Sequence, residues 1–345
     1  MYKKSPQFKT GRFHNAKKIN MLSWDKAHDV VTRYIFQKSR EALPRNPIPV
    51  EPLTRQQLMS APNNTLYRLG HSTVLMKLEG EFWITDPVFC ERASPVQWAG
   101  PKRFHKPPIT IAELPGLKGV ILSHDHYDHL DKAAVKALAH KTQHFYTPLG
   151  VGDLLAAWGV AKTKITQLDW WQSVTVGGME LVSTPAQHFS GRGPHDRFAT
   201  LWASWVIITP QKRIFFSGDT GYFSGFKTIG EKYGPFDITL VETGAYDKGW
   251  PDVHMLPEHT VQAHIDLQGK WLLPIHNSTF DLAMHAWFDP FEQVTTLCRQ
   301  KQLAITTPRI GQPLSIDAPQ SVNYWWKGVM TVKARKASQL SYESR

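Results

Sequence analysis

The sequence predicts an α/β fold in which helices cover the outer faces of β-sheets. Strand-like apolar runs and helical patches alternate from about residue 66 to about residue 315. Hydrophobic residues make up 41% of the 345-residue chain and aromatic residues 12%, so the chain can bury a large core and wholesale disorder is excluded. Its apolar runs are shorter than the ~18 residues that a membrane-spanning helix needs.

Short apolar runs bounded by turn residues predict the individual strands. Leu66–Leu78 is expected to form two strands separated by a Gly-His-Ser turn, and Phe82–Ile84 a further strand that ends at Asp86 and Pro87. The run Gly119–Leu122 predicts a buried strand. Lys132–His140, rich in alanine, predicts the helix after it.

We expect a basic N-terminal extension (residues 1–65), one large domain (66–330) and a basic tail (331–345). Residues 1–20 look irregular. After them, apolar residues recur at helical spacing: Trp24, Ala27, Val30, Val31, Tyr34 and Ile35. This amphipathic helix lies either on the body of the protein or on a membrane surface. A linker rich in proline then leads into the large domain.

The net charge of +11 is concentrated at the two ends of the chain. The first 20 residues contain six basic residues and no acidic one, and the last fifteen contain four basic residues against Glu343. Such ends either bind anionic surfaces, at roughly 1 kcal/mol per basic residue near a membrane, or are solvated and only keep the protein soluble. The nearly neutral centre argues against a nucleic-acid-binding protein.

Cysteine usage and the start of the chain bear on its location. Cys90 and Cys298 are the only cysteines, which excludes a disulfide framework and a cysteine-rich zinc site. The first residues are charged and lack the apolar core of a signal peptide. We therefore expect a cytoplasmic protein, in peripheral contact with the inner face of the membrane where its basic ends bind lipid.

The segment Ser123–Asp131 contains three histidines and three aspartates in nine residues, directly after a predicted buried strand. Imidazole and carboxylate groups are the ligands that Zn²⁺ accepts, and ordinary packing has no use for so many of them. A solvated polar loop with coincidental histidines is the alternative. The density of ligand groups favours a metal site.

Three further strand ends supply candidate ligands. His188 follows the strand-like run Leu181–Thr184, Asp219 follows an apolar run in a tight turn, and His276 ends the run that begins at Trp271. One strand-end histidine is more often structural than a ligand. Three such ends after a three-histidine cluster reverse that expectation.

These residues, in this order, resemble the metallo-β-lactamase superfamily. Further segments, within about residues 66–285, resemble N-acyl-phosphatidylethanolamine-hydrolysing phospholipase D and its bacterial relatives. They are Leu69–Val74, Thr85–Pro87, Arg92–Pro95, Gly100–Phe104, Ala186–His188, Phe216–Tyr222, Gly234–Asp237 and Gly244–Tyr246. The resemblance implies a four-layer αββα sandwich with two mixed sheets back to back, helices outside, and metals at one edge.

The resemblance also implies a ligand set for two metals. His124, His126 and His188 hold the first; Asp128, His129 and His276 hold the second; and Asp219 bridges them. The histidine-rich set favours two Zn²⁺ ions, with other divalent metals as alternatives. Asp125 is expected beside the ligands, where it fixes a histidine tautomer.

The implied reaction is attack of a metal-bridging hydroxide on phosphorus or a carbonyl carbon. Asp128 is expected to orient the nucleophile and to handle its proton. His254 is expected near the mouth of the site, with a role toward phosphate, although Val253 stands where vertebrate-type members have glutamine. Among the other histidines, His71 is the strongest candidate for direct chemistry.

We therefore expect a di-zinc phosphodiesterase of phospholipase D type that acts on an N-acyl phosphatidylethanolamine-like phospholipid. The alternative is a hydrolase on the same scaffold that acts on a soluble ester, lactone or phosphodiester. A nucleic-acid-processing protein is a third hypothesis, supported by the basic ends alone.

Overall fold

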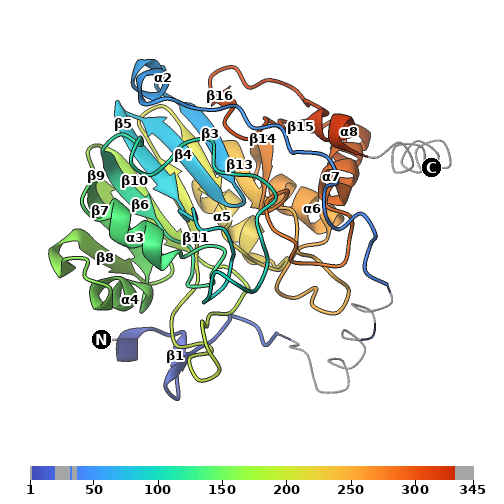
Figure 1. Cartoon of the computed structure of the whole chain (residues 1–345). Helices are drawn as coiled ribbons and strands as arrows, with labels where there is room; N and C mark the ends of the chain where they lie inside the picture. Colours follow the sequence, from blue (N-terminus) through green and yellow to red (C-terminus); the bar gives the residue numbers. More distant parts are fainter. Residues whose placement is uncertain (1, 20–31, 33–36, 331–345) are drawn as a thin grey trace.

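The protein folds into two seven-stranded β-sheets that pack face to face (Figure 1). The computed structural model describes residues 2–19, 32 and 37–330. Most of the predicted amphipathic helix, and the whole basic tail from residue 331, lie outside the described residues.

The first sheet has the strand order β16-β3-β4-β5-β6-β7-β8. Its strands are β3 (Thr65–Gly70), β4 (Thr73–Leu78), β5 (Glu81–Thr85), β6 (Leu117–Ile121), β7 (Thr142–Pro148), β8 (Ile165–Leu168) and β16 (Pro313–Ser315). Strands β5 to β8 are parallel, and the other pairs are antiparallel. The predicted strand pair around the Gly-His-Ser turn is confirmed as β3 and β4.

The second sheet has the order β15-β14-β13-β12-β11-β10-β9. Its strands are β9 (Ser173–Val176), β10 (Met179–Thr184), β11 (Ser204–Ile208), β12 (Arg213–Phe216), β13 (Phe236–Glu242), β14 (Gly269–Ile275) and β15 (Ala304–Ile305). Strands β12 to β15 are parallel, and β9 to β12 are antiparallel. Both sheets are therefore mixed, as predicted.

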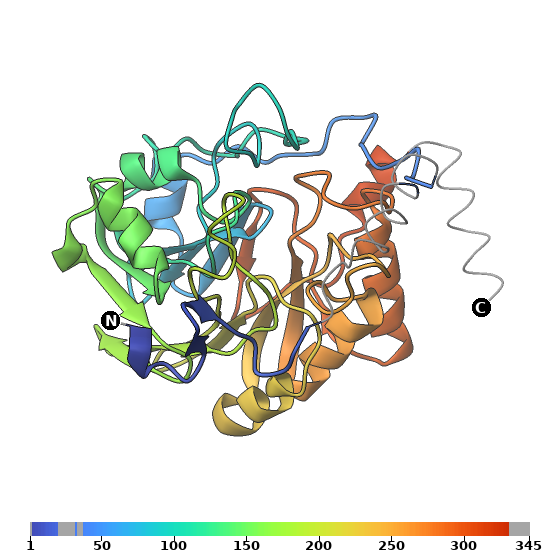
Figure 2. The same ribbon diagram turned by 90° about the horizontal axis from the view of Figure 1, so that it is seen from below.

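Helices cover the outer face of each sheet (Figure 2). They are α2 (Arg55–Ser60), α3 (Lys132–Leu138) and α4 (Val151–Ala157) on the first sheet, and α5 (Gly225–Tyr233), α6 (Pro257–Asp266) and α7 (Asp289–Gln300) on the second, with α8 (Trp325–Val329) packed against α7. Helix α7 packs on its sheet through one apolar face, because Phe291, Val294 and Cys298 recur at helical spacing and are buried. The predicted αββα sandwich is confirmed.

The central core lies between the two sheets. Buried side chains of the first sheet, such as Trp83 and Val74, form one cluster with those of the second, such as Trp205, Phe216 and Leu240. Two further clusters fill the spaces between each sheet and its helices. The inner parallel strands β6 and β13 are buried on both faces over most of their length, so their buried ends, Gly119–Ile121 and Leu240–Val241, read as short continuous runs rather than as alternating ones.

The start of the chain differs from the prediction. Residues 2–19 were expected to be irregular, but Tyr2–Lys4 forms a 3₁₀ turn, and β1 (Phe8–Lys9) pairs with β2 (Arg12–Phe13) in a short hairpin. Thr10 and Gly11 at its tip have φ values of 51° and 80°, the left-handed pair that a tight hairpin turn requires. Within the part of the chain that the structure describes, no helix is long and apolar enough to cross a membrane.

Candidate metal centre

The metal-ligand candidates lie at one edge of the sandwich, where parallel strands from both sheets end. In the first sheet, Asp86 follows β5 and the segment 123–131 follows β6; in the second, Asp219 follows β12, and His276 follows β14. Carboxyl ends of parallel strands meet at the same edge of a sheet, so side chains that follow them converge. The last residue of the segment, Asp131, instead caps α3, because its carboxylate accepts from the amides of Ala133 and Ala134.

A first cluster contains His124, His126, His188 and Asp219, whose ligand atoms all lie within 4.8 Å of one another. His124 Nε2 lies 2.9 Å, and His188 Nε2 3.3 Å, from His126 Nδ1. His124 and His188 each also place Nε2 3.8 Å from Asp219 Oδ2. Three imidazoles and one carboxylate oxygen therefore surround one point.

A second cluster contains His71, Asp128, His129 and His276, again with ligand atoms within 4.8 Å of one another. His129 Nε2 and His276 Nε2 lie 3.5 and 3.3 Å from Asp128 Oδ2. His71 Nε2 lies 3.0 Å from the same oxygen. The structure thus brings together every residue of the predicted ligand set, and adds His71, which the sequence had marked as the strongest of the other histidines.

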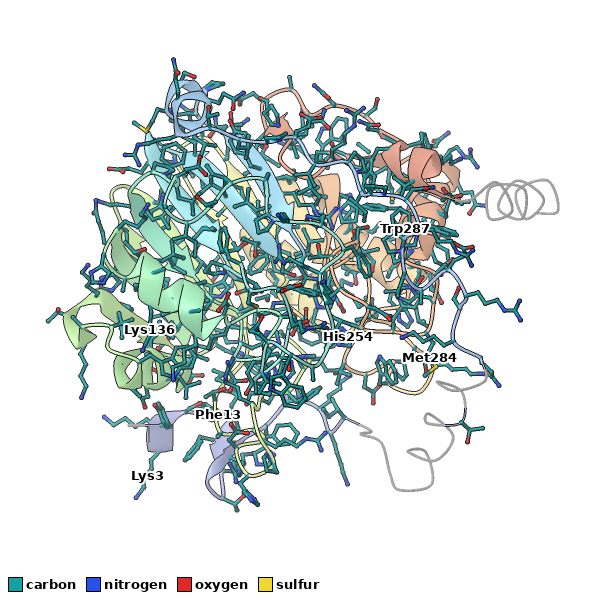
Figure 3. All side chains as sticks on the ribbon, in the orientation of Figure 1. Lys3, Phe13, Lys136, His254, Met284 and Trp287 are labelled. Carbon is teal, nitrogen blue, oxygen red and sulfur yellow. The ribbon has the colours of Figure 1, made fainter. Side chains whose placement is uncertain are left out.

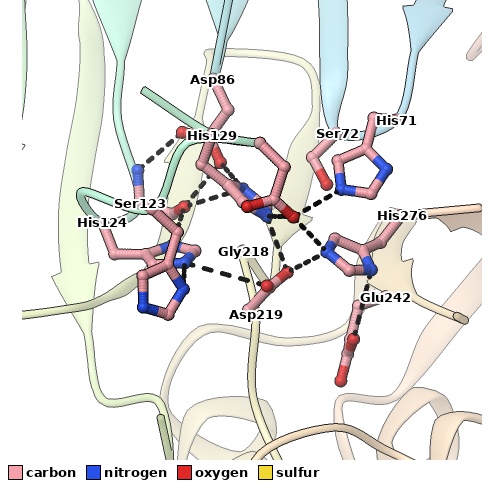
Figure 4. Close-up of polar contacts among 12 residues, drawn as sticks. His71, Ser72, Asp86, Ser123, His124, His129, Gly218, Asp219, Glu242 and His276 are labelled. Atoms are coloured by element: carbon pink, nitrogen blue, oxygen red, sulfur yellow. Dashed lines mark hydrogen bonds and ion pairs between the residues drawn. The ribbon is translucent and has the colours of Figure 1, made fainter. Parts of the chain in front are cut away.

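Asp219 joins the two clusters (Figure 4). Its Oδ2 faces His124 and His188, whereas its Oδ1 lies 3.0 Å from Nε2 of both His129 and His276. One carboxylate therefore presents one oxygen to each cluster, the geometry of a bridging ligand.

Unpaired polar atoms at the second cluster fit a cation. His129 Nε2, His276 Nε2 and Asp219 Oδ1 are buried, and none has a hydrogen-bond partner of acceptable geometry among the described residues. Buried polar atoms are rarely left unpaired, because each costs about 1–3 kcal/mol. Converging imidazole nitrogens and carboxylate oxygens are the ligands that one divalent ion such as Zn²⁺ binds.

The comparisons with known proteins agree with this geometry. Residues 83–277, more than half of the chain, match a family model described as "Beta-lactamase superfamily domain". The chain belongs to the metallo-β-lactamase superfamily. An uncharacterized protein of Mycobacterium tuberculosis is 38% identical over 94% of this chain and 88% of its own length. An N-acyl-phosphatidylethanolamine-hydrolyzing phospholipase D of Caenorhabditis elegans is 35% identical over 70% of this chain and 71% of its own length.

Solved structures show the same fold. An isothiocyanate hydrolase from Delia radicum gut bacteria superimposes with a TM-score of 0.58 at 19% identity, over 72% of this chain and 98% of its own length. The metallo-hydrolase Igni18 of Ignicoccus hospitalis gives 0.56 at 20% identity, over 72% of this chain and 97% of its own. The family match, the 35% identity with the C. elegans enzyme and the His/Asp clusters together show that this metallo-β-lactamase-superfamily protein is a metal-dependent hydrolase with a His/Asp metal-binding cluster.

Three strand-end histidines of this hydrolase, His129, His124 and His188, have a hydrogen-bond partner on Nδ1, whereas Nδ1 of His276 has none among the described residues. Nδ1 of His129 lies 2.6 Å from Asp86 Oδ2, Nδ1 of His124 lies 2.9 Å from Ser123 Oγ, and Nδ1 of His188 lies 2.9 Å from the carbonyl oxygen of Val253. His276 Nδ1 lies 3.8 Å from Glu242 Oε2. The three hydrogen bonds direct Nε2 toward the cluster, as partners of metal-bound histidines do.

Asp86 and Glu242 were missed by the sequence analysis. Asp86 accepts from the backbone amide and the hydroxyl of Ser123 as well as contacting His129. Glu242, at the end of β13, is fully buried and lies 3.0 Å from His254 Nδ1. Both follow an apolar run, the signal that identified Asp219 and His276, so the same reasoning could have found them.

The expected role of Asp125 is wrong. Its carboxylate accepts from the amide of Gly191 at 2.8 Å and from the hydroxyl of Thr200 at 2.9 Å, rather than contacting a histidine. Asp125 lies between His124 and His126 in the chain, but its carboxylate is bound by the loop 191–200 and not by either histidine. It anchors the loop after His188 instead.

We expect Asp86→Asn to weaken metal binding about 10- to 100-fold, the usual effect of changing a partner of a metal-bound histidine. The amide that replaces the carboxylate removes the charge that holds Nδ1–H of His129. Competition with a chromogenic zinc chelator measures the change. Asp317→Asn, which alters an exposed carboxylate paired with Lys212, is the matched control and should bind metal as the wild type does.

Carboxylates and histidines at this centre shift each other's pKa. Burial lowers the pKa of His276, but Asp219 and Asp128 more than offset it and raise this pKa to about 9. The same two carboxylates hold the pKa of His129 well above its ordinary value despite burial. Burial lowers the pKa of His124 and His188 well below theirs, which keeps these imidazoles neutral.

Metal affinity should therefore rise with pH. A bound histidine must be neutral, so below a pKa of about 9 a cation has to displace the proton of His276. Affinity is expected to increase up to about that pH and then level off. Calorimetry of zinc binding to the metal-free protein, in two buffers of different ionisation enthalpy, should show release of at least about one proton near neutral pH. Binding without proton release would contradict this assignment.

Proposed function

We propose that this hydrolase is a di-zinc phosphodiesterase of phospholipase D type that acts on an N-acyl phosphatidylethanolamine-like phospholipid. The observation that carries the proposal is the pair of His/Asp clusters joined by Asp219. His124, His126 and His188 would hold one ion, Asp128, His129 and His276 the other, and Asp219 both. The identity with the C. elegans enzyme supports the choice of substrate class.

Asp128 is the group that handles the proton of the attacking water. When bound, the two cations lower the pKa of a water molecule and stabilise negative charge on the phosphate. Asp128 Oδ2 lies within 3.0–3.5 Å of three imidazoles, and their hydrogen bonds and charge hold its pKa well below its ordinary value although burial opposes this. It is therefore ionised and oriented to accept a hydrogen bond from the nucleophile.

We assign to His254 the contact with the phosphate. Its ring centre lies 5.2 Å from that of His188 and 5.4 Å from that of His276, beside both clusters. Glu242 occupies Nδ1, which leaves Nε2 as the nitrogen that would contact a phosphate oxygen. The same carboxylate lies 3.8 Å from His276 Nδ1, beyond hydrogen-bonding distance, so it orients His254 and adds negative charge beside the proposed ligand His276.

A groove of about 740 Å³ is lined by Tyr127, the neighbour of Asp128, and by Trp158, Asp131 and the basic Lys132, Lys136 and Arg192. Its lining contains none of the proposed metal ligands and not His254. The Arg192 guanidinium lies 3.9 Å from the Tyr127 ring centre and donates to the carbonyls of Asp125 and Leu130. The groove therefore provides a basic and aromatic surface beside the segment 123–131 and does not by itself identify the substrate.

A substrate screen with metal analysis on the same sample tests the proposal. N-acyl phospholipids, plain phosphodiesters and lactones are offered to the zinc-loaded protein. The proposal predicts phosphatidic acid and an N-acylethanolamine as products, with about two zinc ions per chain. Turnover of the lactones or soluble diesters alone would favour the alternative of a hydrolase for soluble substrates.

Peripheral membrane contact requires a test that leaves the hairpin in place. Five exposed lysines of residues 2–19 carry most of the charge of this segment: Lys3, Lys4, Lys9, Lys17 and Lys18. Changing all five to glutamine removes five of its six positive charges without deleting the segment, and it keeps Arg12, whose guanidinium donates to the carbonyl of His195. If the basic end binds membrane, co-sedimentation with anionic vesicles should be salt-sensitive in the wild type and weaker in this variant.

A further inference from the structure

The N-terminal hairpin is attached to the loops that surround the metal centre. The ring of Phe13 is completely buried with Trp170, Leu201 and Trp202, and the amide of Phe13 donates to the carbonyl of Phe198 at 2.9 Å. Figure 3 shows Phe13 at the edge of the body, whereas Lys3 points away from it. Residues 2–19 are therefore packed on the domain and present their lysines to solvent.

Asn15, just after the hairpin, binds the backbone of His188 in both directions. Its Nδ2 donates to the carbonyl oxygen of His188 at 2.7 Å, and its Oδ1 accepts from the amide of His188 at 3.0 Å. The same Oδ1 accepts from Trp202 Nε1 at 3.0 Å. A side-chain amide thus pairs with a backbone residue as a neighbouring strand would.

His188 needs this support because it lies beyond its strand. Strand β10 ends at Thr184, and His188 lies in irregular structure four residues later. The carbonyl of Val253 holds its ring, and the backbone of the preceding Gln187 is bonded to the hydroxyl of Thr220 and the amide of Gly221, but none of these bonds involves the backbone of His188 itself. In the described part of the chain, Asn15 is the partner of both backbone polar groups of His188.

We propose that the N-terminal segment is part of the metal centre: Asn15 is a positioning residue that fixes His188 as a ligand of the first metal ion. This inference rests on the proposed metal role of His188. By linkage, whatever the docked segment adds to metal affinity, bound metal adds to docking of the segment by the same factor.

We call the two hydrogen bonds between the Asn15 side chain and the backbone of His188 the clamp. Variants in the full-length chain test it. Asn15→Ala removes all three hydrogen bonds, and Phe13→Leu loosens the hairpin without touching His188. Asn46→Ala is the matched control, because Asn46 also donates a side-chain amide to a carbonyl, that of Val329. Zinc affinity is measured by chelator competition, and ligand geometry by the absorption spectrum of the Co²⁺-loaded protein.

Asn15→Ala should bind one zinc ion about 10- to 100-fold more weakly and should change the Co²⁺ spectrum. Phe13→Leu should show a smaller change of the same kind, and Asn46→Ala none. A loss confined to the melting temperature of the metal-free protein, with zinc affinity and spectrum unchanged, would overturn the inference.

Hydrogen exchange provides the reciprocal measurement. Metal loading should slow exchange of the amides of residues 8–15 in the wild type, and this protection should disappear in Asn15→Ala. Equal exchange with and without zinc in the wild type would contradict the coupling. If the wild type bound no zinc, the proposed metal centre itself would be refuted, and the clamp with it. If the wild type and Asn15→Ala bound zinc with equal affinity, only the clamp would be refuted.

Discussion

Asp219→Ala is expected to abolish metal binding at both clusters and to lower hydrolysis by at least about 10³-fold, since bound metal supplies several kcal/mol of transition-state stabilisation. Among the residues that the structure describes, Asp219 is the one that offers an oxygen to each cluster. Its removal also leaves His129 and His276 without the carboxylate that lies 3.0 Å from each. Elemental analysis of the purified variant, beside a phosphodiester assay, measures both effects.

Asp219→Asn sharpens this test. The amide keeps the size of the side chain but retains a single oxygen, so it can serve one cluster and not both. We expect the zinc content to fall toward about one ion per chain, with activity close to that of the alanine variant. Asp317→Ala, at an exposed ion pair with Lys212, is the control and should keep full metal content. Full zinc content in Asp219→Ala would be incompatible with a bridging role.

Asp128→Asn is expected to keep much of the metal but to lose about 10²- to 10⁴-fold in turnover, the usual contribution of a group that handles a proton. Asparagine retains an oxygen toward His71 and His276, so the second cluster loses charge rather than its geometry. It has no basic oxygen to accept a proton. Steady-state kinetics with metal analysis of the same sample separate the two effects.

Comparison with Asp219→Asn shows whether the loss of turnover in Asp128→Asn comes from the proton-handling role or from loss of metal. Both are isosteric changes of an aspartate at the centre, one partly exposed (Asp128) and one buried (Asp219), yet only the change at Asp128 should leave the metal largely in place. A fully active Asp128→Asn would contradict the assignment. A variant that lost all its zinc would show that Asp128 acts as a ligand alone.

Much of the centre could be predicted because its chemistry is local in the sequence. Each predicted ligand follows an apolar run, and the ends of parallel strands meet at one sheet edge, so strand-end polar residues converge whatever the details of packing. The same signal was present at Asp86 and Glu242 but was not used. Asp125 shows the limit of this reasoning, since it lies among the ligands in sequence and yet bonds to Gly191 and Thr200.

Asn15 could not be predicted in this way. It lies 173 residues from His188 in the chain, in a segment whose composition indicated only a basic, irregular end. Nothing in its neighbours distinguishes it from a solvated asparagine. Its partner is a backbone, and any backbone offers the same donor and acceptor.

By itself the sequence predicted an α/β fold and the candidate ligands, because apolar periodicity and dense imidazole and carboxylate groups are properties of short stretches, whereas the four-layer αββα arrangement was implied by the family resemblance. The tertiary structure alone decided which oxygen of Asp219 faces which cluster, which nitrogen of each histidine points inward, and where the N-terminal hairpin lies. Those features depend on contacts between residues far apart in the chain, and their directions follow from packing of the two sheets rather than from local pattern.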